Sequence, residues 1–124
     1  MLVSNLLAIH QKKYIGKLSA FCGAVSAGYA CGAAITYMLG GNFNQIANTI
    51  INTLANTSGI ICDGAKPSCA AKISSALDAA LLAHTMSMHD DVFHADEGIV
   101  KDDLEKLIRS GRIYWSRRNE INRY

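Results

Sequence analysis

Two cysteines seven residues apart, Cys62 and Cys69, are the side chains of this sequence best suited to chemistry. The intervening DGAKPS combines a glycine, a proline and two opposite charges, which is typical of a tight loop. Pro67 favours a helix start, so Cys69 should lie in a first helical turn, where free backbone N–H groups stabilise a thiolate. Such thiolates can bind zinc or iron. A disulfide or buried structural cysteines are the alternatives.

A metal site would need further ligands, because a structural zinc or a cubane iron–sulfur cluster takes three or four from the protein. Cys22 and Cys31, both in a segment of small residues, are the other two cysteines. The amino terminus lacks the order of a secretory signal, since Lys12 and Lys13 follow its apolar stretch rather than precede it. We therefore expect a cytoplasmic protein, whose reducing surroundings favour metal binding over disulfides.

The elements that position these cysteines should belong to one small domain spanning residues 1–124. Hydrophobic residues make up 50% of the chain and aromatic residues only 7%, which suits helices that pack closely through small side chains. The net charge of +2 is too small to indicate a nucleic acid or an acidic membrane surface as partner. The basic stretch 109–123 is interpreted as an exposed, solvated tail.

Apolar spacing and glycine punctuation predict an all-α fold, a compact helical domain with buried helices of small residues. We expect helices over residues 2–13, 19–39, 44–57, 68–84 and 101–109. No stretch alternates apolar and polar residues as a half-buried strand would. Residues 18–41 carry no charge and could span a bilayer, but their many Gly, Ala and Ser side chains gain little from transfer to lipid. A small membrane protein is the weaker alternative.

The helix expected over residues 44–57 places asparagine–threonine pairs between its apolar positions. These pairs are Asn48–Thr49, Asn52–Thr53 and Asn56–Thr57. Such side chains compete for backbone hydrogen bonds and ordinarily weaken a helix. A solvated face is the simple interpretation, and a polar wall that lines a pocket is the functional one.

Three histidines, His84, His89 and His94, follow one another at five-residue intervals, with Asp90 and Asp91 among them. Metal ligands on one helix face lie three or four residues apart, so a single helix could not direct all three histidines to one ion. We expect surface histidines, with a zinc site gathered by a loop as the alternative.

The stretch CDGAKPSCAAK, preceded by NTSGII and followed by a helix of small residues, resembles the C-terminal part of the L-cysteine desulfidases. These belong with the α-chain domain of the iron–sulfur L-serine dehydratases. FCGA at residues 21–24, YMLGG at 37–41, and GIV at 98–100 with Asp103, Glu105 and Lys106 extend the resemblance over residues 18–111. After Gly111 the sequence departs from the pattern, which leaves residues 112–124 as a divergent basic tail.

The resemblance implies a [4Fe-4S] cluster held by Cys22, Cys62 and Cys69, with one iron left open for substrate. Cys31 matches no ligand and is interpreted as a small buried residue. The open iron would act as a Lewis acid on the carboxylate and the departing thiol or hydroxyl of a small amino acid. The implied reaction is β-elimination of L-cysteine or L-serine to pyruvate and ammonia, with sulfide or water.

The proton-abstracting residue proposed for that family lies near the start of a much longer chain, and nothing in this sequence matches it. We therefore expect a cluster-binding segment of a lyase that is inactive alone. A homo-oligomer or a partner chain would complete it with the missing N-terminal part. A non-catalytic helical subunit or gene remnant is the alternative, and the choice between cysteine and serine as substrate stays open.

Overall fold

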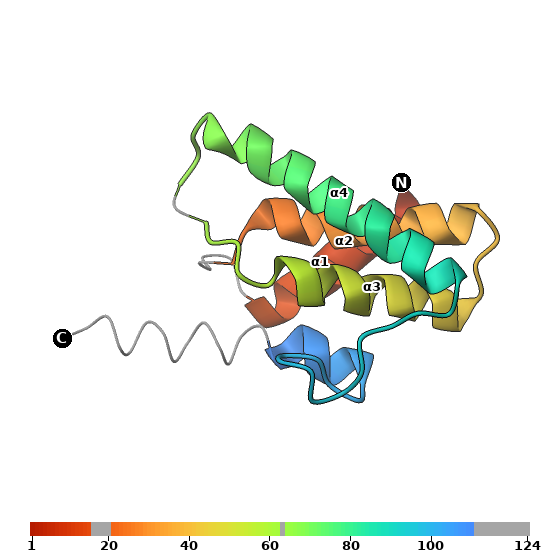
Figure 1. The fold of residues 1–124 in the computed structure, drawn as a ribbon. Helices are drawn as coiled ribbons and strands as arrows, with labels where there is room; N and C mark the ends of the chain where they lie inside the picture. The colour runs from red at the N-terminus through yellow and green to blue at the C-terminus, as the bar shows by residue number, and fades with distance from the viewer. Residues whose placement is uncertain (16–20, 63, 111–124) are drawn as a thin grey trace.

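The computed structural model describes residues 1–15, 21–62 and 64–110, and this part of the chain is all-α, as the sequence predicts. Its elements are α1 (Leu2–Ile15), α2 (Gly23–Met38), α3 (Phe43–Thr57), α4 (Ser68–Met88) and a further helical stretch at residues 104–110 (Figure 1). The β pairing of the described residues consists of one isolated bridge. The predicted basic tail at 112–124 lies outside the described residues.

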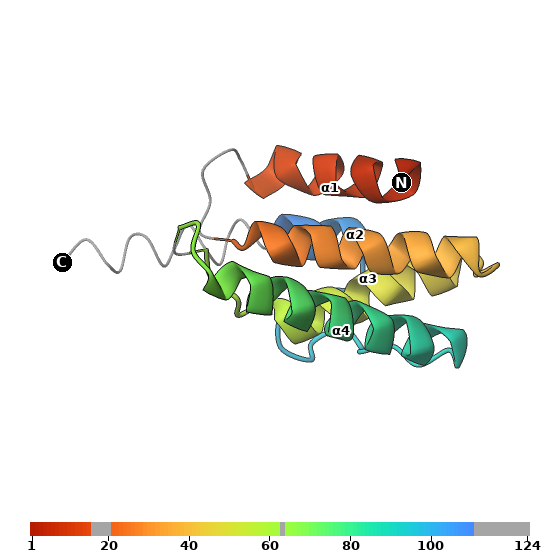
Figure 2. The ribbon, with the colours of Figure 1, turned by 90° about the horizontal axis from the view of Figure 1, so that it is seen from above.

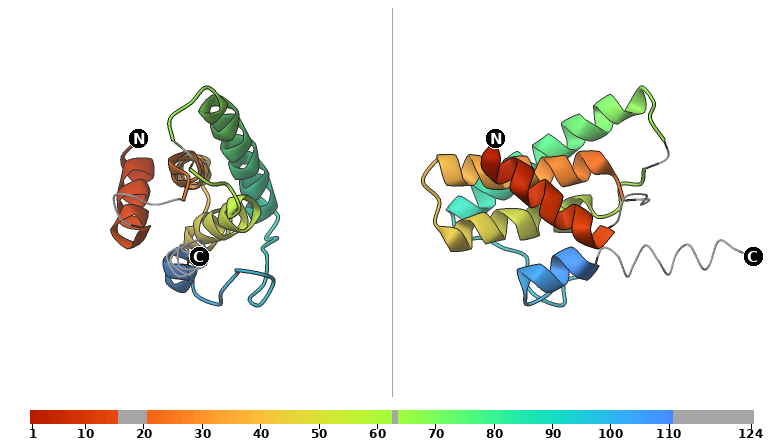
Figure 3. Two further views of the ribbon diagram at one scale, coloured as in Figure 1. Left: turned by 90° about the vertical axis from the view of Figure 1, so that its left-hand side faces the viewer. Right: turned by 180° about the vertical axis from the view of Figure 1, so that it is seen from behind.

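The central helix of the bundle is α2. It contacts α1, α3 and α4, and α3 and α4 also pack against each other. Figure 2 shows α1 and α4 on opposite sides of α2, and Figure 3 shows residues 104–110 at one side of the bundle. The core that joins these elements includes Val25, Tyr29, Ile50, Leu54 and Leu107.

Local sequence signals account for most helix ends. The predicted stop at Gly40 and Gly41 is confirmed, and Gly40 has a φ of 84°, which glycine adopts without strain. Asn42 then caps α3: its Oδ1 accepts from the backbone N–H of Gln45 at 2.9 Å, and the Gln45 side chain accepts from the Asn42 N–H at 3.0 Å. Pro67 immediately precedes α4, as its preference for helix starts predicts.

Two glycines of α2 let that helix approach α4 closely. A Cβ atom added at Gly28 would lie 2.7 Å from the Cβ of Ala76, and one added at Gly32 would lie 2.9 Å from the Cβ of Ala80. Both separations are shorter than real carbon atoms accept. The small residues therefore serve helix packing, and this is the physical reason for the composition of the segment.

Replacing Gly28 with alanine should lower the free energy of unfolding by about 1–3 kcal/mol, because the backbone of Ala76 also lies 3.0 Å from the new methyl group and cannot easily move. Gly23→Ala is the matched control in the same helix, where nothing lies within 4 Å. It should stabilise the protein by about 0.4–1 kcal/mol. Urea unfolding of both variants measures the difference, and equal effects would contradict this packing.

The prediction of a solvated asparagine–threonine face on α3 is wrong for most of its residues. Thr49, Asn52, Thr53 and Thr57 are buried. The hydroxyl of Thr49 lies 2.9 Å from that of Thr36 on α2 and 2.6 Å from that of Ser87 on α4, so it joins three helices. The alternative of a pocket wall holds only at the end of the helix, where Asn56 and Thr57 line a groove.

The amide of Asn52 fastens the chain that follows α4 to α3. Its Nδ2 donates to the carbonyl of Asp91 at 2.9 Å, and its Oδ1 accepts from the backbone N–H of Phe93 at 3.0 Å. A buried amide that satisfies two backbone groups holds an irregular segment in place. Thr49 and Asn52 of α3 are thus structural connections between elements.

The uncharged segment at residues 18–41 contributes α2, which has 16 residues and lies at the centre of the bundle. None of the helices in the described part of the chain is both long enough and apolar enough to cross a bilayer.

Candidate metal centre

An antiparallel β-bridge between Phe21 and Ile61 places the two cysteine-bearing segments side by side. Cys22 directly follows Phe21, and Cys62 directly follows Ile61. Lys72 of α4 donates from its Nζ to the carbonyl oxygen of Ile61 at 2.9 Å, which ties the beginning of α4 to the same segment. Figure 1 shows the start of α2, the end of α3 and the start of α4 at one end of the bundle.

The three predicted ligands differ in their surroundings. Cys22 is only 4% exposed and occupies the N-cap of α2 in an extended conformation. Cys62 is exposed in the loop, and Cys69 is half-buried in the first turn of α4, where its Sγ lies 3.7 Å from the carbonyl of Gly64. All three thiols are free, as is the half-buried Cys31 in the middle of α2.

Three free thiols around one loop suit an iron–sulfur cluster in the chemistry of the donor set. They are not gathered into a ligand set: within the described ranges, no three Cys, His, Asp or Glu side chains could together hold a metal ion. The bridge brings the backbone of Cys22 to the loop, but the Cys22 side chain is buried while Cys62 is exposed. The structure therefore gives the neighbourhood of the predicted ligands and leaves the ligand geometry as a prediction.

An open groove runs beside this loop, between the end of α3 and the start of α4. Its volume is about 580 Å³, and it is lined by Ile60, Ile61, Ser68, Ala71, Lys72 and Ser75. A second hollow of about 320 Å³ shares Ile60 and Ser75 with it and adds Asn56 and Asp78. The two together offer hydroxyl, amide, ammonium and carboxylate groups next to the cysteine loop.

The histidines do not form a site. His89 and His94 are exposed, as expected, but the expectation is wrong for His84, which is half-buried. Its Nδ1 lies 2.8 Å from the hydroxyl of Thr36, so His84 belongs to the polar connection among α2, α3 and α4.

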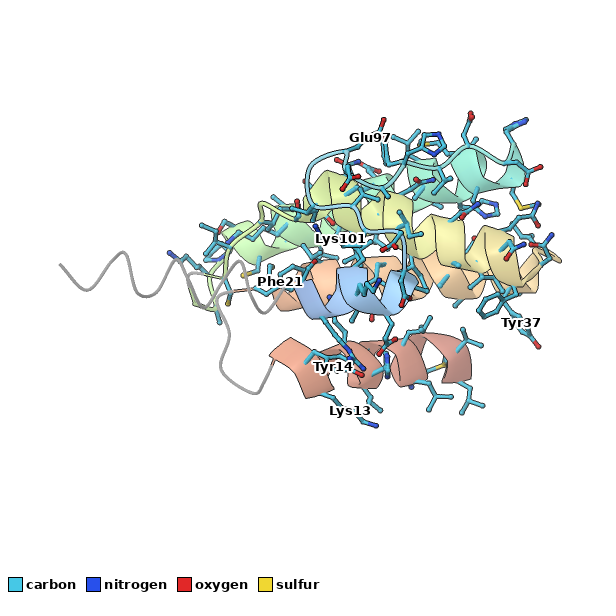
Figure 4. All side chains as sticks on the ribbon, turned by 90° about the horizontal axis from the view of Figure 1, so that it is seen from below. Lys13, Tyr14, Phe21, Tyr37, Glu97 and Lys101 are labelled. Atoms are coloured by element: carbon cyan, nitrogen blue, oxygen red, sulfur yellow. The ribbon has the colours of Figure 1, made fainter. Side chains whose placement is uncertain are left out.

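A polar cluster that the sequence did not predict fastens α1 to residues 104–110. Glu105 accepts from the hydroxyl of Tyr14 at 2.7 Å and lies 3.0 Å from Nε2 of His10. The guanidinium of Arg109 lies over the ring of Tyr14, 5.1 Å from its centroid. Figure 4 shows Tyr14 directed from α1 toward residues 104–110, whereas Lys13 points away. His10 and Tyr14 lie four residues apart, and so do Glu105 and Arg109, so each pair shares one helix face. This spacing is the signal in the sequence that could have indicated the cluster.

The hydrogen bonds from Tyr14 and His10 lower the pKa of Glu105 below its ordinary value of 4.5. A carboxylate with a depressed pKa stabilises the folded state above its unfolded pKa, and this contribution is lost as the pH falls through the lowered value. The difference in melting temperature between the wild type and Glu105→Gln should therefore shrink when the pH falls from 7 to well below 4.5. Tyr14→Phe, which removes the largest cause, should weaken this pH dependence; an unchanged dependence would contradict the assignment.

Comparison with known proteins identifies relatives of this chain. The family model described as serine dehydratase alpha chain matches residues 1–117. A UPF0597 protein of Treponema denticola is 64% identical over 108 residues, which are 87% of this chain and 25% of that protein. One from Lachnoclostridium phytofermentans is 60% identical over 108 residues, 87% of this chain and 26% of its own length. One from Bacteroides fragilis is 39% identical over 124 residues, 99% of this chain and 29% of its own length.

The chain thus spans about a quarter of the length of the first of these curated relatives. No solved structure matches it. The family match covers the bridge, the cysteine loop and all four helices of the description above. The chain therefore belongs to the serine dehydratase alpha chain family.

Proposed function

We propose that this chain is the cluster-binding segment of a lyase that β-eliminates L-cysteine or L-serine. The products would be pyruvate and ammonia, with sulfide from cysteine or water from serine. Membership of the serine dehydratase alpha chain family supports the reaction class. The observation that carries the site is the bridge between Phe21 and Ile61, which holds Cys22 beside the cysteine loop.

In this proposal Cys22, Cys62 and Cys69 hold a [4Fe-4S] cluster through their thiolates. When bound, the cluster would supply an open iron as a Lewis acid for the substrate's carboxylate and leaving group. Because Cys22 is buried and Cys62 is exposed, the loop must close on Cys22 rather than the reverse. The groove beside the loop would offer the hydroxyls of Ser68 and Ser75 to a small amino acid.

The proposal assigns no proton-abstracting residue to this chain, so the chain alone should be inactive. The family segments that it does not span would supply that residue, on this polypeptide, on a partner chain or in a homo-oligomer. A cytoplasmic location belongs to the same proposal, because reducing conditions keep all four thiols available.

Alkylation of the thiols before and after anaerobic reconstitution with iron and sulfide tests the ligand assignment. Iodoacetamide should label Cys62 and Cys69 in the apoprotein and leave both unlabelled once the cluster is bound, because coordinated thiolates do not react. Cys31, which is half-buried and outside the proposed ligand set, serves as the internal control and should be labelled equally before and after reconstitution. Equal labelling of Cys62 before and after reconstitution would overturn the proposal.

A further inference from the structure

The helix α4 buries small residues and exposes several of its large apolar ones. The residues that it buries are small and include Ala76, Ala79, Ala80 and Ala83. Its large apolar residues face outward: Ile73 is 50% exposed, Leu77 39% and Leu81 49%. A helix at the surface of a complete domain buries its largest apolar side chains and exposes polar ones. The exposed side of α4 therefore carries three large apolar side chains next to the exposed polar residues Ser74, Asp78 and Thr85.

Packing against α2 explains why the inner face is small. The positions of Gly28 and Gly32 leave room for nothing larger than the methyl groups of Ala76 and Ala80. The large side chains thus cannot be exchanged to the inside by rotating the helix. Single exposed apolar residues are common, but three spaced by four residues form a continuous row on one helix face. Below, the term outer row means Ile73, Leu77 and Leu81.

The outer row lies along the edge of the bundle. Figures 2 and 3 show α4 on the side of α2 opposite to α1, with its outer side uncovered by any other described helix. The same helix begins with Cys69 in its first turn and lines the groove through Lys72 and Ser75. Whatever covers the outer row therefore comes close to the candidate metal centre.

We propose that the outer row is the docking surface for the family segments that this chain does not span, whether they are on this polypeptide or on a separate one. Their amount supports this occupant, because the Treponema denticola relative matches this chain over only 25% of its length. Roughly three-quarters of such a protein lies outside the match, and a continuous row of exposed large apolar side chains is typical of a surface that packs against another element. The occupant should present a complementary apolar helix face. This inference rests on the proposed function only in that docking would bring the missing proton-abstracting residue toward the cluster.

Co-expression tests the docking surface. The 124-residue chain is expressed together with a tagged polypeptide carrying the part of the Treponema denticola relative that lies outside its match. The wild-type chain should co-purify at equal stoichiometry, and Leu77→Glu/Leu81→Glu should reduce its recovery at least about tenfold, because a charge buried in an apolar interface is strongly unfavourable. Leu6→Glu, at a more exposed apolar position on α1, is the control and should be recovered like the wild type.

Circular dichroism of each variant shows that the helices are intact, as expected for substitutions at exposed positions. Equal recovery of the double variant and the wild type, or no recovery of the wild type, would overturn the proposal. So would a dimer of the chain alone that Leu77→Glu/Leu81→Glu dissociates, because the occupant would then be a second copy. The assay uses apoprotein without iron, so a failure of docking and a failure of cluster binding are separate results.

Discussion

The Cys62→Ala variant should lose nearly all of the iron that the wild-type chain takes up on anaerobic reconstitution. Three protein thiolates are the smallest set proposed for this cluster, and two cannot hold it. Cys62 is exposed and makes no contribution to the core, so its removal should leave the fold unchanged. Iron per chain, measured by atomic emission after desalting, should fall at least about tenfold.

Two further variants make this result interpretable. Cys31→Ala, in the middle of α2, should retain the full iron content, because Cys31 is not among the proposed ligands. Cys69→Ser should behave like Cys62→Ala, since Cys69 lies in the first turn of α4 and is only half-buried. Cys22 is a less informative position, because it is buried and its replacement also changes the core. Wild-type iron content in Cys62→Ala would contradict the ligand assignment.

Turnover should depend on family segments that this chain does not span. The reconstituted chain alone should produce no pyruvate above background from L-cysteine or L-serine, because the proposed function places the residue that abstracts the α-proton on family segments that this chain does not span. Addition of the remaining family segments should restore turnover, and the missing general base alone accounts for about 10²–10⁴-fold in rate. A coupled assay with lactate dehydrogenase under anaerobic conditions measures pyruvate directly.

The control for this experiment is the Cys62→Ala chain combined with the same family segments. It should stay inactive, because the segments would supply a base without the Lewis acid. Pyruvate formation by the wild-type chain alone would contradict the account and would place the base among its own residues. The ratio of rates with cysteine and serine would at the same time identify the preferred substrate.

Much of the fold could be predicted from the sequence because its signals are local. The glycine pair at residues 40–41, the cap at Asn42 and the position of Pro67 each act within a few residues of a helix end. The predicted range 44–57 differs from α3 by one residue at its start. The predicted range 68–84 has the same first residue as α4, which extends four residues further. The small-residue composition of α2 correctly indicated close helix packing.

The burial of individual side chains could not be predicted from the sequence, because it depends on which helices pack against each other. Thr49 and Asn52 look like solvated residues in isolation, and they are buried only because α2, α4 and the chain after α4 pack against them. Helical spacing groups Ala76 and Ala80 of α4 with Leu77 and Leu81, but only the two alanines are buried and the two leucines are exposed. Likewise Glu105 meets His10 and Tyr14 across ninety or more residues of sequence.

The candidate site divides in the same way. Cys62 and Cys69 can be recognised from the local sequence, because a loop lies between them and Cys69 falls in the first turn of the next helix. Cys22 entered only through the family resemblance, and the bridge between Phe21 and Ile61 supplies the physical reason to group it with the other two. In the proposed function the loop would close around a cluster only when the metal is bound, and no spacing in the sequence predicts that step.

The iron and acid-labile sulfide content of the reconstituted wild-type chain tests whether this chain binds the proposed iron–sulfur cluster. The account predicts a brown protein with about four iron atoms and four sulfides per chain after removal of unbound metal. A colourless protein with no more iron than the Cys62→Ala variant would contradict it.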